Sequence, residues 1–411
     1  MGAACFLGGR NFELFVEKIR QICYTQSMMN EIPLSVPKLN INILDNLREC
    51  IETGWISTGG RFIAEFEKRV AAYTGALDAV STQSGTSGLQ LALRILGVQP
   101  KDEVIVPTLT FIAAVNVVKY VGAEPVFMDC GDDLCIDPDK LEQFCAESCS
   151  LTEDGLINNL TKNRISAIIV VHVFGNMADM ERINDIAQKY RFKVIEDATE
   201  ALGTYYTGGR FCGKFAGTVS DMGVYSFNAN KIITTGGGGM IVSGNQQYMD
   251  EARYLSTTAK DDPIYFVHDD VGYNYRMLNI QAALGVSQIE ELESFILIKK
   301  KNYERYRELL DGKKGITVIP FKEETRPNYW FYSIFVDESK YGSDRDVLMK
   351  KLLEANIQCR PVWKLISTQK PYLSALSVNI EKAHIYAANV LNLPCSVNLT
   401  EKQIQYVCEL I

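Results

Sequence analysis

The chain has 411 residues, of which 47% are hydrophobic and 22% are charged, so it can bury a large core in two domains or in one domain with a lobe. A formal net charge of -8 and a pI near 5.2 exclude a broadly basic surface, and we therefore expect no nucleic-acid partner. The eleven cysteines are odd in number and scattered through apolar stretches, and there are only three histidines, which predicts reduced core thiols and no metal centre.

Residues 1–31 are the first predicted unit, an N-terminal helical extension. One face of a short amphipathic helix carries Phe12, Phe15, Ile19 and Ile22. The segment lacks the charged start and apolar centre of a signal peptide, and nowhere do about 18 apolar residues run together. We therefore expect no membrane span and a cytoplasmic location, and we assign these residues no function.

Residues 32–275 are predicted to form a large α/β domain. Between residues 76 and 245, short apolar runs alternate with amphipathic helices. The runs lack the two-residue alternation of half-exposed strands, as expected of strands buried on both faces. They are "DEVIVPTLTF", "AEPVFMDC", "ISAIIVVHVFG", "FKVIEDA", "MGVYSF" and "GMIVSG". This order predicts a mostly parallel central sheet with helices on both faces.

Two of the intervening helices have clear signals. One starts at Pro138 with Asp137 as its N-cap. The other lies in "DMERINDIAQKY" and should bury one face, made by Met180, Ile183, Ile186, Ala187 and Tyr190.

Residues 276–411 are predicted to form a smaller α+β domain. A long helical pattern covers 279–310, followed by a strand-like run at 329–338 and a helix at 344–357. The lysine-rich "IKKKNYER" at 298–305 is interpreted as a solvated face of the long helix.

A glycine- and serine-rich turn is the first candidate for chemistry. In "STQSGTSGLQLALRIL", Gly85, Thr86, Ser87 and Gly88 open a helix. Free backbone N–H groups, two hydroxyls and the positive end of the helix dipole suit a phosphate. Taken alone, a plain helix cap is the commoner explanation.

Two further candidates end predicted strands. Phe111 lies just past the strand "EVIVP", where an isolated aromatic is usually part of the core. Glu196 and Asp197 end another strand, and because adjacent strand residues point to opposite faces, only one carboxylate can face a given cleft. That carboxylate needs a cationic or hydrogen-bonding partner.

The fourth candidate is Lys231, between the strand "MGVYSF" and four consecutive glycines. An amine in a confined, partly desolvated pocket can act as a nucleophile toward a carbonyl. For an arbitrary lysine, a surface turn is the commoner explanation. Together, however, a phosphate cradle, an aromatic ring, a strand-end carboxylate and a reactive lysine make a coherent site for pyridoxal 5'-phosphate.

From about Ile32 to its end, the chain resembles the DegT/DnrJ/EryC1/StrS family of sugar aminotransferases. The resemblance is carried by "IETGWISTGGRFIAEFEKRVAAYTG", "SGTSGLQLAL", "GAEPVFMD", "VHVFGNMADM", "VIEDATEALG", "GTVSDMGVYSFNANKIITTGGGG", "VGYNYRMLNIQAALG" and "LPCSVNLTEKQ". It implies the fold-type I architecture of pyridoxal phosphate-dependent transferases. The stretch "NKIITTGGGG" looks most like the corresponding sequence of the LegC branch, which is linked to legionaminic acid and bacillosamine-type sugars.

The resemblance also implies roles for individual residues. Lys231 would form the Schiff base with the cofactor and Asp197 would hold its pyridine nitrogen, while Glu200 would lie near its phenolic oxygen. Phe111 would stack on the ring, and Asn274 would reach the phosphate in a neighbouring subunit, which implies a homodimer with shared sites. The remaining implied contacts are with the phosphate, from Gly85, Thr86, Ser87 and Ser226, and with the substrate, from His172, Asn228 and Arg276.

One departure concerns the glycine run. Many family members have TTGEGG where this chain has Gly237, so a role of that glutamate cannot be transferred here.

The implied reaction has two halves. An amino donor, expected to be L-glutamate, gives its amino group to the cofactor, and a nucleotide-linked 4-keto-6-deoxy sugar then receives it. Lys231 would move the proton in both halves. The branch resemblance favours UDP-2-acetamido-2,6-dideoxy-hexos-4-ulose, with GDP and dTDP sugars left open.

Three other functions compete with this one. A related sugar dehydratase would have histidine in place of Lys231, and a regulatory protein on the same scaffold would not need the complete set of reactive groups. A dinucleotide-dependent dehydrogenase would need a GxGxxG turn between its first strand and helix, which is missing.

Overall fold

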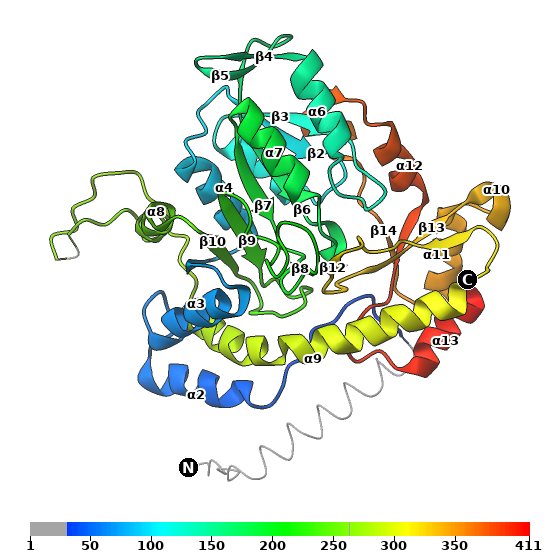
Figure 1. The fold of residues 1–411 in the computed structure, drawn as a ribbon. Helices are drawn as coiled ribbons and strands as arrows, with labels where there is room; N and C mark the ends of the chain where they lie inside the picture. The colour runs from blue at the N-terminus through cyan, green and yellow to red at the C-terminus, as the bar shows by residue number, and fades with distance from the viewer. Residues whose placement is uncertain (1–30, 263) are drawn as a thin grey trace, which may run out of the picture.

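The computed structural model describes residues 31–262 and 264–411, and it consists of a large central sheet, a smaller sheet and one long helix beneath them (Figure 1). The predicted amphipathic helix at Phe12 to Ile22 lies outside these residues. Most strands of the large sheet lie between residues 78 and 243, as the alternating pattern predicted.

The large sheet has ten strands and is parallel over most of its width. Its main path runs β1 (Asp78–Thr82), β10 (Gly239–Ser243), β9 (Met222–Ser226), β7 (Lys193–Asp197), β6 (Arg164–Val171), β2 (Glu103–Pro107), β3 (Glu124–Met128) and β15 (Leu376–Val378). The pairs β1–β10 and β10–β9 are antiparallel, and every pair from β9 to β15 is parallel. The hairpin of β4 (Cys149–Thr152) and β5 (Gly155–Asn158) pairs antiparallel with the first residues of β6. The predicted fold class is confirmed, and the six predicted runs each contain a strand.

Helices pack on the sheet in two groups. One comprises α4 (Gly85–Ile95) with α5 (Ala113–Tyr120) and α8 (Gln246–Ser256), which both contact it. The other comprises α6 (Pro138–Glu147) and α7 (Met180–Tyr190), which Figure 1 shows in front of the strands. The predicted buried face of α7 is the observed one, with the same five residues. The predicted N-cap of α6 is also confirmed, because the Asp137 side chain accepts hydrogen bonds from the N–H groups of Asp139 and Lys140.

The second half of the chain is organised around α9 (Asn279–Leu310), which begins and ends where the helical pattern predicted. It packs against α2 (Ile43–Thr53), α3 (Arg61–Thr74) and α13 (Glu401–Leu410). The smaller sheet has the order β11 (Ile316–Val318), β13 (Tyr332–Val336), β16 (Val390–Leu393) and β14 (Arg360–Pro361). The other elements are β8 (Tyr205–Tyr206), β12 (Thr325–Arg326), α10 (Glu338–Tyr341), α11 (Arg345–Glu354), α12 (Glu381–Asn389) and the 3-10 turns Val173–Gly175, Ile366–Thr368 and Lys370–Tyr372.

The two predicted domains are more interwoven than a division at residues 275 and 276 implies. Strand β15, from the C-terminal part, forms the edge of the large sheet by pairing with β3. At the other end, Ile32 pairs with Ile357 beside the small sheet. Both connections join residues more than 240 positions apart, which local sequence patterns do not record.

Buried sulfur and nitrogen groups complete the core. Of the nine cysteines in the described residues, eight are buried, all nine are free, and Cys212 is exposed. Lys299 corrects the interpretation of the lysine-rich stretch as wholly solvated, because it is buried and donates hydrogen bonds to the carbonyls of Trp330 and Cys395.

In residues 31–262 and 264–411, none of the helices combines the length and the apolar character that a membrane crossing needs. The same residues contain no cluster of three or more His, Cys, Asp or Glu arranged to hold a metal ion.

Candidate active site

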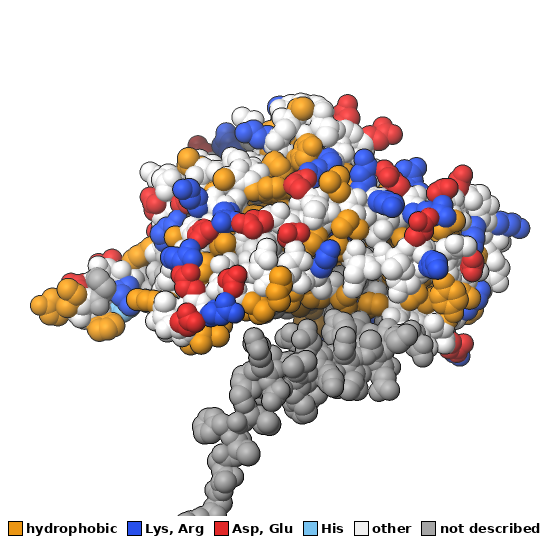
Figure 2. Space-filling model, turned by 90° about the horizontal axis from the view of Figure 1, so that it is seen from below, with side chains coloured by type: hydrophobic (Ala, Val, Ile, Leu, Met, Phe, Trp, Pro, Cys, Tyr) orange, Lys and Arg blue, Asp and Glu red, His pale blue; other side chains and the backbone are white. Residues whose placement is uncertain are grey.

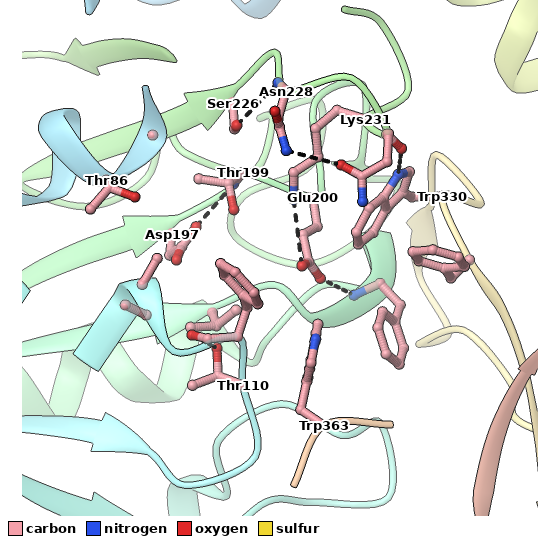
Figure 3. A pocket seen from close by; sticks show the side chains of 18 of the residues that line it. Thr86, Thr110, Asp197, Thr199, Glu200, Ser226, Asn228, Lys231, Trp330 and Trp363 are labelled. Carbon is pink, nitrogen blue, oxygen red and sulfur yellow. Dashed lines mark hydrogen bonds and ion pairs between the residues drawn. The ribbon is translucent and has the colours of Figure 1, made fainter. Parts of the chain in front are cut away.

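A cavity of about 640 Å³ lies where the large sheet meets the C-terminal part of the chain. Its volume is in the range of cofactor and substrate sites. The walls come from the start of α4, the ends of β7 and β9, the loop after β9, and the segments around Trp330 and 360–364. Figure 3 shows side chains from these separate segments around one cavity.

The start of α4 forms the first wall. Ser84 is the N-cap, and its Oγ accepts a hydrogen bond of 3.0 Å from the Ser87 N–H. Gly85 and Thr86 line the cavity, whereas Ser87 does not, and the Ser87 Oγ lies 2.8 Å from the Ser84 Oγ. The structure therefore places Ser84, rather than the predicted Ser87, in the wall beside Ser226.

Glycine at the head of this helix allows a close approach to two neighbouring side chains. A Cβ on Gly85 would lie 2.8 Å from Cγ2 of Thr199 and 3.1 Å from Cβ of Ser226. The close approach brings the positive end of α4 next to the ends of β7 and β9. The hydroxyls here, with the first N–H groups of the helix that have no partner within it, form a surface that fits a phosphate.

Asp197 ends β7 and is 5% exposed, with its carboxylate facing the cavity. Its Oδ1 accepts a hydrogen bond of 3.1 Å from the Thr199 N–H, and no Lys, Arg or His of residues 31–262 and 264–411 lies within ion-pair distance of it. Burial raises the pKa of the Asp197 carboxyl above its ordinary value. A buried carboxylate of this kind favours a cationic N–H group as its missing partner.

Glu196, the preceding residue, points to the other side of β7, as strand alternation requires. It is fully buried and is not part of the cavity wall. Its carboxylate is satisfied inside the protein by His172 Nε2 at 2.9 Å, the N–H groups of Gly217 and Val219, and the Ser220 hydroxyl.

His172 is not in the position of a substrate contact. Its ring is fully buried, with Nε2 bonded to Glu196 and Nδ1 accepting from the Ala178 N–H at 3.2 Å. Both ring nitrogens are thus used, and we interpret His172 as a structural residue that orients Glu196 beneath the sheet.

Lys231 and Glu200 meet at the opposite wall. The Lys231 Nζ lies 3.6 Å from Glu200 Oε1, and Glu200 Oε2 accepts a hydrogen bond of 2.8 Å from the Phe174 N–H. Burial raises the pKa of Glu200 to about 7, and the nearby Lys231 partly opposes this shift. Glu200 can therefore take up or release a proton near neutral pH.

The four glycines at 236–239 mainly allow the backbone to pack closely against its neighbours. Gly236 and Gly238 have φ values of 78° and 136°, which disfavour other residues. A Cβ on Gly239 would lie 2.5 Å from the backbone of Ser84. At Gly237 the nearest atom would be 3.5 Å away, so this position alone in the run has ordinary backbone and space for a side chain, as the glutamate of TTGEGG requires.

The other predicted residues are divided between the cavity and its surroundings. Phe111 lines the cavity with 55% of its surface exposed, and Asn228 lines it as well. Arg276 does not, because its guanidinium is paired with Glu67 at 2.6 Å. Asn274 is exposed and outside the cavity of its own chain.

Several lining residues were missed from the sequence. Ser84, Thr110 and Thr199 are immediate neighbours of predicted residues and belong to the same turns. The larger omission is the C-terminal wall, to which Trp330, Arg360, Trp363 and Lys364 contribute. In the sequence these residues lie in apolar or mixed runs with no local motif, so only the tertiary fold brings them to the site.

The residues present fit pyridoxal phosphate. The cradle at α4 suits its phosphate, the uncompensated Asp197 suits a protonated ring nitrogen, and the Lys231 amine is close to a buried acid. The exposed Phe111 ring is available to cover a planar ligand.

Comparisons with known proteins agree with this geometry. A model of the DegT/DnrJ/EryC1/StrS aminotransferase family matches residues 37–411. A GDP-perosamine synthase of Caulobacter vibrioides is 36% identical over 382 residues, which are 93% of this chain and 97% of that protein. A UDP-4-amino-4-deoxy-L-arabinose--oxoglutarate aminotransferase of Shewanella sediminis is 31% identical over 397 residues, covering 93% and 94% of the two chains. A crystal structure of DesI in the presence of its TDP-sugar product superimposes with a TM-score of 0.82 at 26% identity, covering 95% of each chain.

Proposed function

Since the chain belongs to the DegT/DnrJ/EryC1/StrS aminotransferase family, we propose that it transfers an amino group from L-glutamate to the keto carbon of a nucleotide-linked 4-keto-6-deoxy sugar. The protein is a pyridoxal phosphate-dependent nucleotide-sugar aminotransferase. One observation supports the proposed amino transfer. Hydroxyl groups suited to a phosphate, a buried carboxylate without an ion-pair partner and a lysine line one cavity.

Each cavity wall would hold one part of the cofactor. Gly85, Thr86 and Ser226 would bind its phosphate, and Asp197 would accept a hydrogen bond from its protonated ring nitrogen. When bound, pyridoxal phosphate supplies an electron sink for the electrons of a breaking C–H bond. Phe111 would cover the ring and exclude water.

The chain's own acid–base groups would move the proton. In each half of the reaction, the Lys231 amine would take the proton from one carbon atom and return it to another, because it is the only lysine amine near both Glu200 and Asp197 in the described residues. Glu200, with a pKa of about 7, would keep that amine in place and adjust its charge.

Two cations at the cavity rim would receive the diphosphate of the sugar nucleotide. Arg360 and Lys364 both line the cavity, and neither is within ion-pair distance of a carboxylate among the described residues. Arg276, the arginine expected from the family resemblance, is occupied by Glu67. The free charge at the rim makes residues 360 and 364 better candidates.

The nucleotide is the least constrained part of the proposal. Resemblance to the LegC branch favoured a UDP-linked 2-acetamido sugar, but the family match specifies no branch, and the relatives include three named GDP-perosamine synthase. The deciding assay supplies L-glutamate with GDP-, UDP- and dTDP-4-keto-6-deoxy sugars and follows the release of 2-oxoglutarate.

We also propose that two copies of the chain share their sites. Asn274 is exposed near a projecting segment whose tip carries Ile264, Tyr265 and Phe266, exposed by 77%, 79% and 68%. Figure 2 shows hydrophobic atoms gathered at this tip. A second copy covering the tip would bury this apolar surface and bring its Asn274 toward the first cavity.

Replacement of Lys231 tests the proposed reaction. Lys231→Ala should bind pyridoxal phosphate without covalent attachment and should release no 2-oxoglutarate from L-glutamate. Lys231→Arg keeps the charge but not a usable nucleophile, so it controls for loss of the ion pair with Glu200. Wild-type turnover in either variant would refute the role of Lys231, and silence of the wild type toward all three sugars would refute the proposed substrate class.

A further inference from the structure

The Lys231 amine has an aromatic neighbour that the proposed function does not use. Its Nζ lies 4.2 Å from the centre of the Trp330 ring, in addition to its contact with Glu200. Both are labelled in Figure 3. An ammonium group over the face of tryptophan is attracted by the negative face of the ring, most strongly where water is excluded.

Trp330 is held in place at three points. Its backbone N–H donates to Asn328 Oδ1 at 2.9 Å, and its indole Nε1 donates to the Asn230 carbonyl at 2.8 Å. Its own carbonyl accepts a hydrogen bond of 3.1 Å from Lys299 Nζ. With 3% of its surface exposed, the indole has little freedom to leave the Lys231 amine.

The residues that hold Trp330 also hold the opposite partner of the amine. The Asn328 side-chain amide donates to the carbonyls of Glu200 and Leu202 at 2.8 and 3.0 Å. One buried asparagine therefore fixes the distance between the segment that carries Glu200 and the segment that carries Trp330.

Lys299 strengthens this arrangement from behind. It is 3% exposed, has no carboxylate within ion-pair distance in the described residues, and donates its second hydrogen bond to the Cys395 carbonyl at 2.5 Å. Burial of an amine is costly unless its hydrogen bonds are satisfied. The buried Lys299 amine therefore needs the Trp330 carbonyl as a hydrogen-bond acceptor, and this bond keeps Trp330 in a fixed position.

We propose that Trp330 is a positioning residue whose indole face, together with the Glu200 carboxylate, holds the charged form of the Lys231 amine at one place in the cavity. The inference rests on the proposed function, because it assumes that this amine carries the proton. The indole would stabilise the ammonium form and orient it, while the ring itself would exchange no proton.

The test measures how fast the Lys231 amine of the full-length apoenzyme captures added pyridoxal phosphate, followed by visible absorbance, as the pH is varied. Only the uncharged amine can attack the aldehyde. Loss of the indole in Trp330→Leu should therefore move the pH of half-maximal rate downward by about 0.5 to 1.5 units.

Trp330→Phe is the matched control. Both variants lose the Nε1 hydrogen bond to Asn230, and only Trp330→Phe keeps an aromatic face, so its midpoint should lie between those of wild type and Trp330→Leu. The other charged groups facing the amine are Glu200 and Asp197, with Arg360 and Lys364 at the rim, and all four stay unchanged in the series. Repeating it in a Glu200→Gln background removes the titration of that acid.

The outcomes separate this inference from the proposed function. If the wild type captures pyridoxal phosphate and the Leu and Phe midpoints coincide, with only a uniform fall in rate, Trp330 is merely structural and the inference is refuted. If Trp330→Leu does not fold, the shift of Trp330→Phe relative to wild type still decides. If the wild type captures no pyridoxal phosphate, the proposed function itself fails.

Discussion

Replacing Gly85 with alanine should weaken the binding of pyridoxal phosphate while leaving the fold intact. The new Cβ would lie 2.8 Å from Thr199 Cγ2 and 3.1 Å from Ser226 Cβ. Carbon atoms in contact normally lie about 3.5–4.0 Å apart. The two side chains must therefore move by several tenths of an ångström, and both line the proposed phosphate cradle.

The size of the effect follows from the cost of overpacking, which is about 1–3 kcal/mol. In the free chain, Thr199 and Ser226 can turn toward the cavity, but a bound phosphate closes that route, so we expect most of the cost to appear in the Kd. Since 1.4 kcal/mol is about a factor of ten, the Kd for pyridoxal phosphate should rise about 5- to 150-fold. Titration of the apoenzyme, followed by visible absorbance, measures it.

Gly244→Ala is the matched control, because a Cβ there would meet no atom within 4 Å. Gly244 lies between β10 and α8, outside the cavity. Its Kd and Tm should equal those of the wild type. A Gly85→Ala variant with a wild-type Kd would refute the placement of the phosphate at the start of α4.

Three further predictions concern acid–base balance, assembly and the rim. Because burial raises the pKa of Glu200 to about 7, the folded chain keeps a proton that the unfolded chain loses near pH 4.5, so the Glu200 contribution to wild-type stability should fall by up to about 1.4 kcal/mol per pH unit between about pH 4.5 and 7. This slope should be absent in Glu200→Gln, and parallel urea-unfolding stabilities of the two proteins across that window would contradict the reasoning. If sites are shared, mixing inactive Lys231→Ala and Asn274→Ala subunits should restore about a quarter of the sites. Half of the random dimers are then mixed, and each mixed dimer has one intact site. No gain in activity on mixing would argue against sharing. Joint replacement of Arg360 and Lys364 by glutamine should raise the KM for the nucleotide sugar about tenfold or more, most strongly at low salt, and an unchanged KM would exclude the rim as the diphosphate site.

The parts of the fold that sequence predicts well are those set by local periodicity. The five apolar positions of α7 recur every three or four residues, and this spacing alone determines which face is buried. Likewise, alternation along β7 places Asp197 and Glu196 on opposite sides before any contact is known. Strand β15 has no comparable signal, because its three residues are recruited by pairing with β3 far away in the chain.

The same contrast applies to the site. Asp197 ends a strand, Lys231 follows one and the turn at Gly85 opens a helix, and the family resemblance adds roles to them. Trp330 lies in an aromatic run that is typical of a core strand, and Lys299 lies in a basic run that is typical of a surface. The hydrogen bond from Lys299 to Trp330 joins residues more than 30 positions apart. The contact between Trp330 and Lys231 joins residues separated by about a quarter of the chain.

The distribution of charge explains how one cavity could serve two unlike substrates in turn. L-Glutamate and a sugar nucleotide each carry one anionic group remote from the reacting carbon, the γ-carboxylate in the first and the diphosphate in the second, and both must bring that carbon to Lys231. The inner wall carries the acid Glu200, which would repel that group, whereas Arg360 and Lys364 at the rim would attract it. Each substrate would therefore enter with this remote anionic group directed outward and its reacting carbon inward. Under the proposed function, the negative charge deep in the cavity and the positive charge at its rim would orient both substrates in the same way, although their shapes differ.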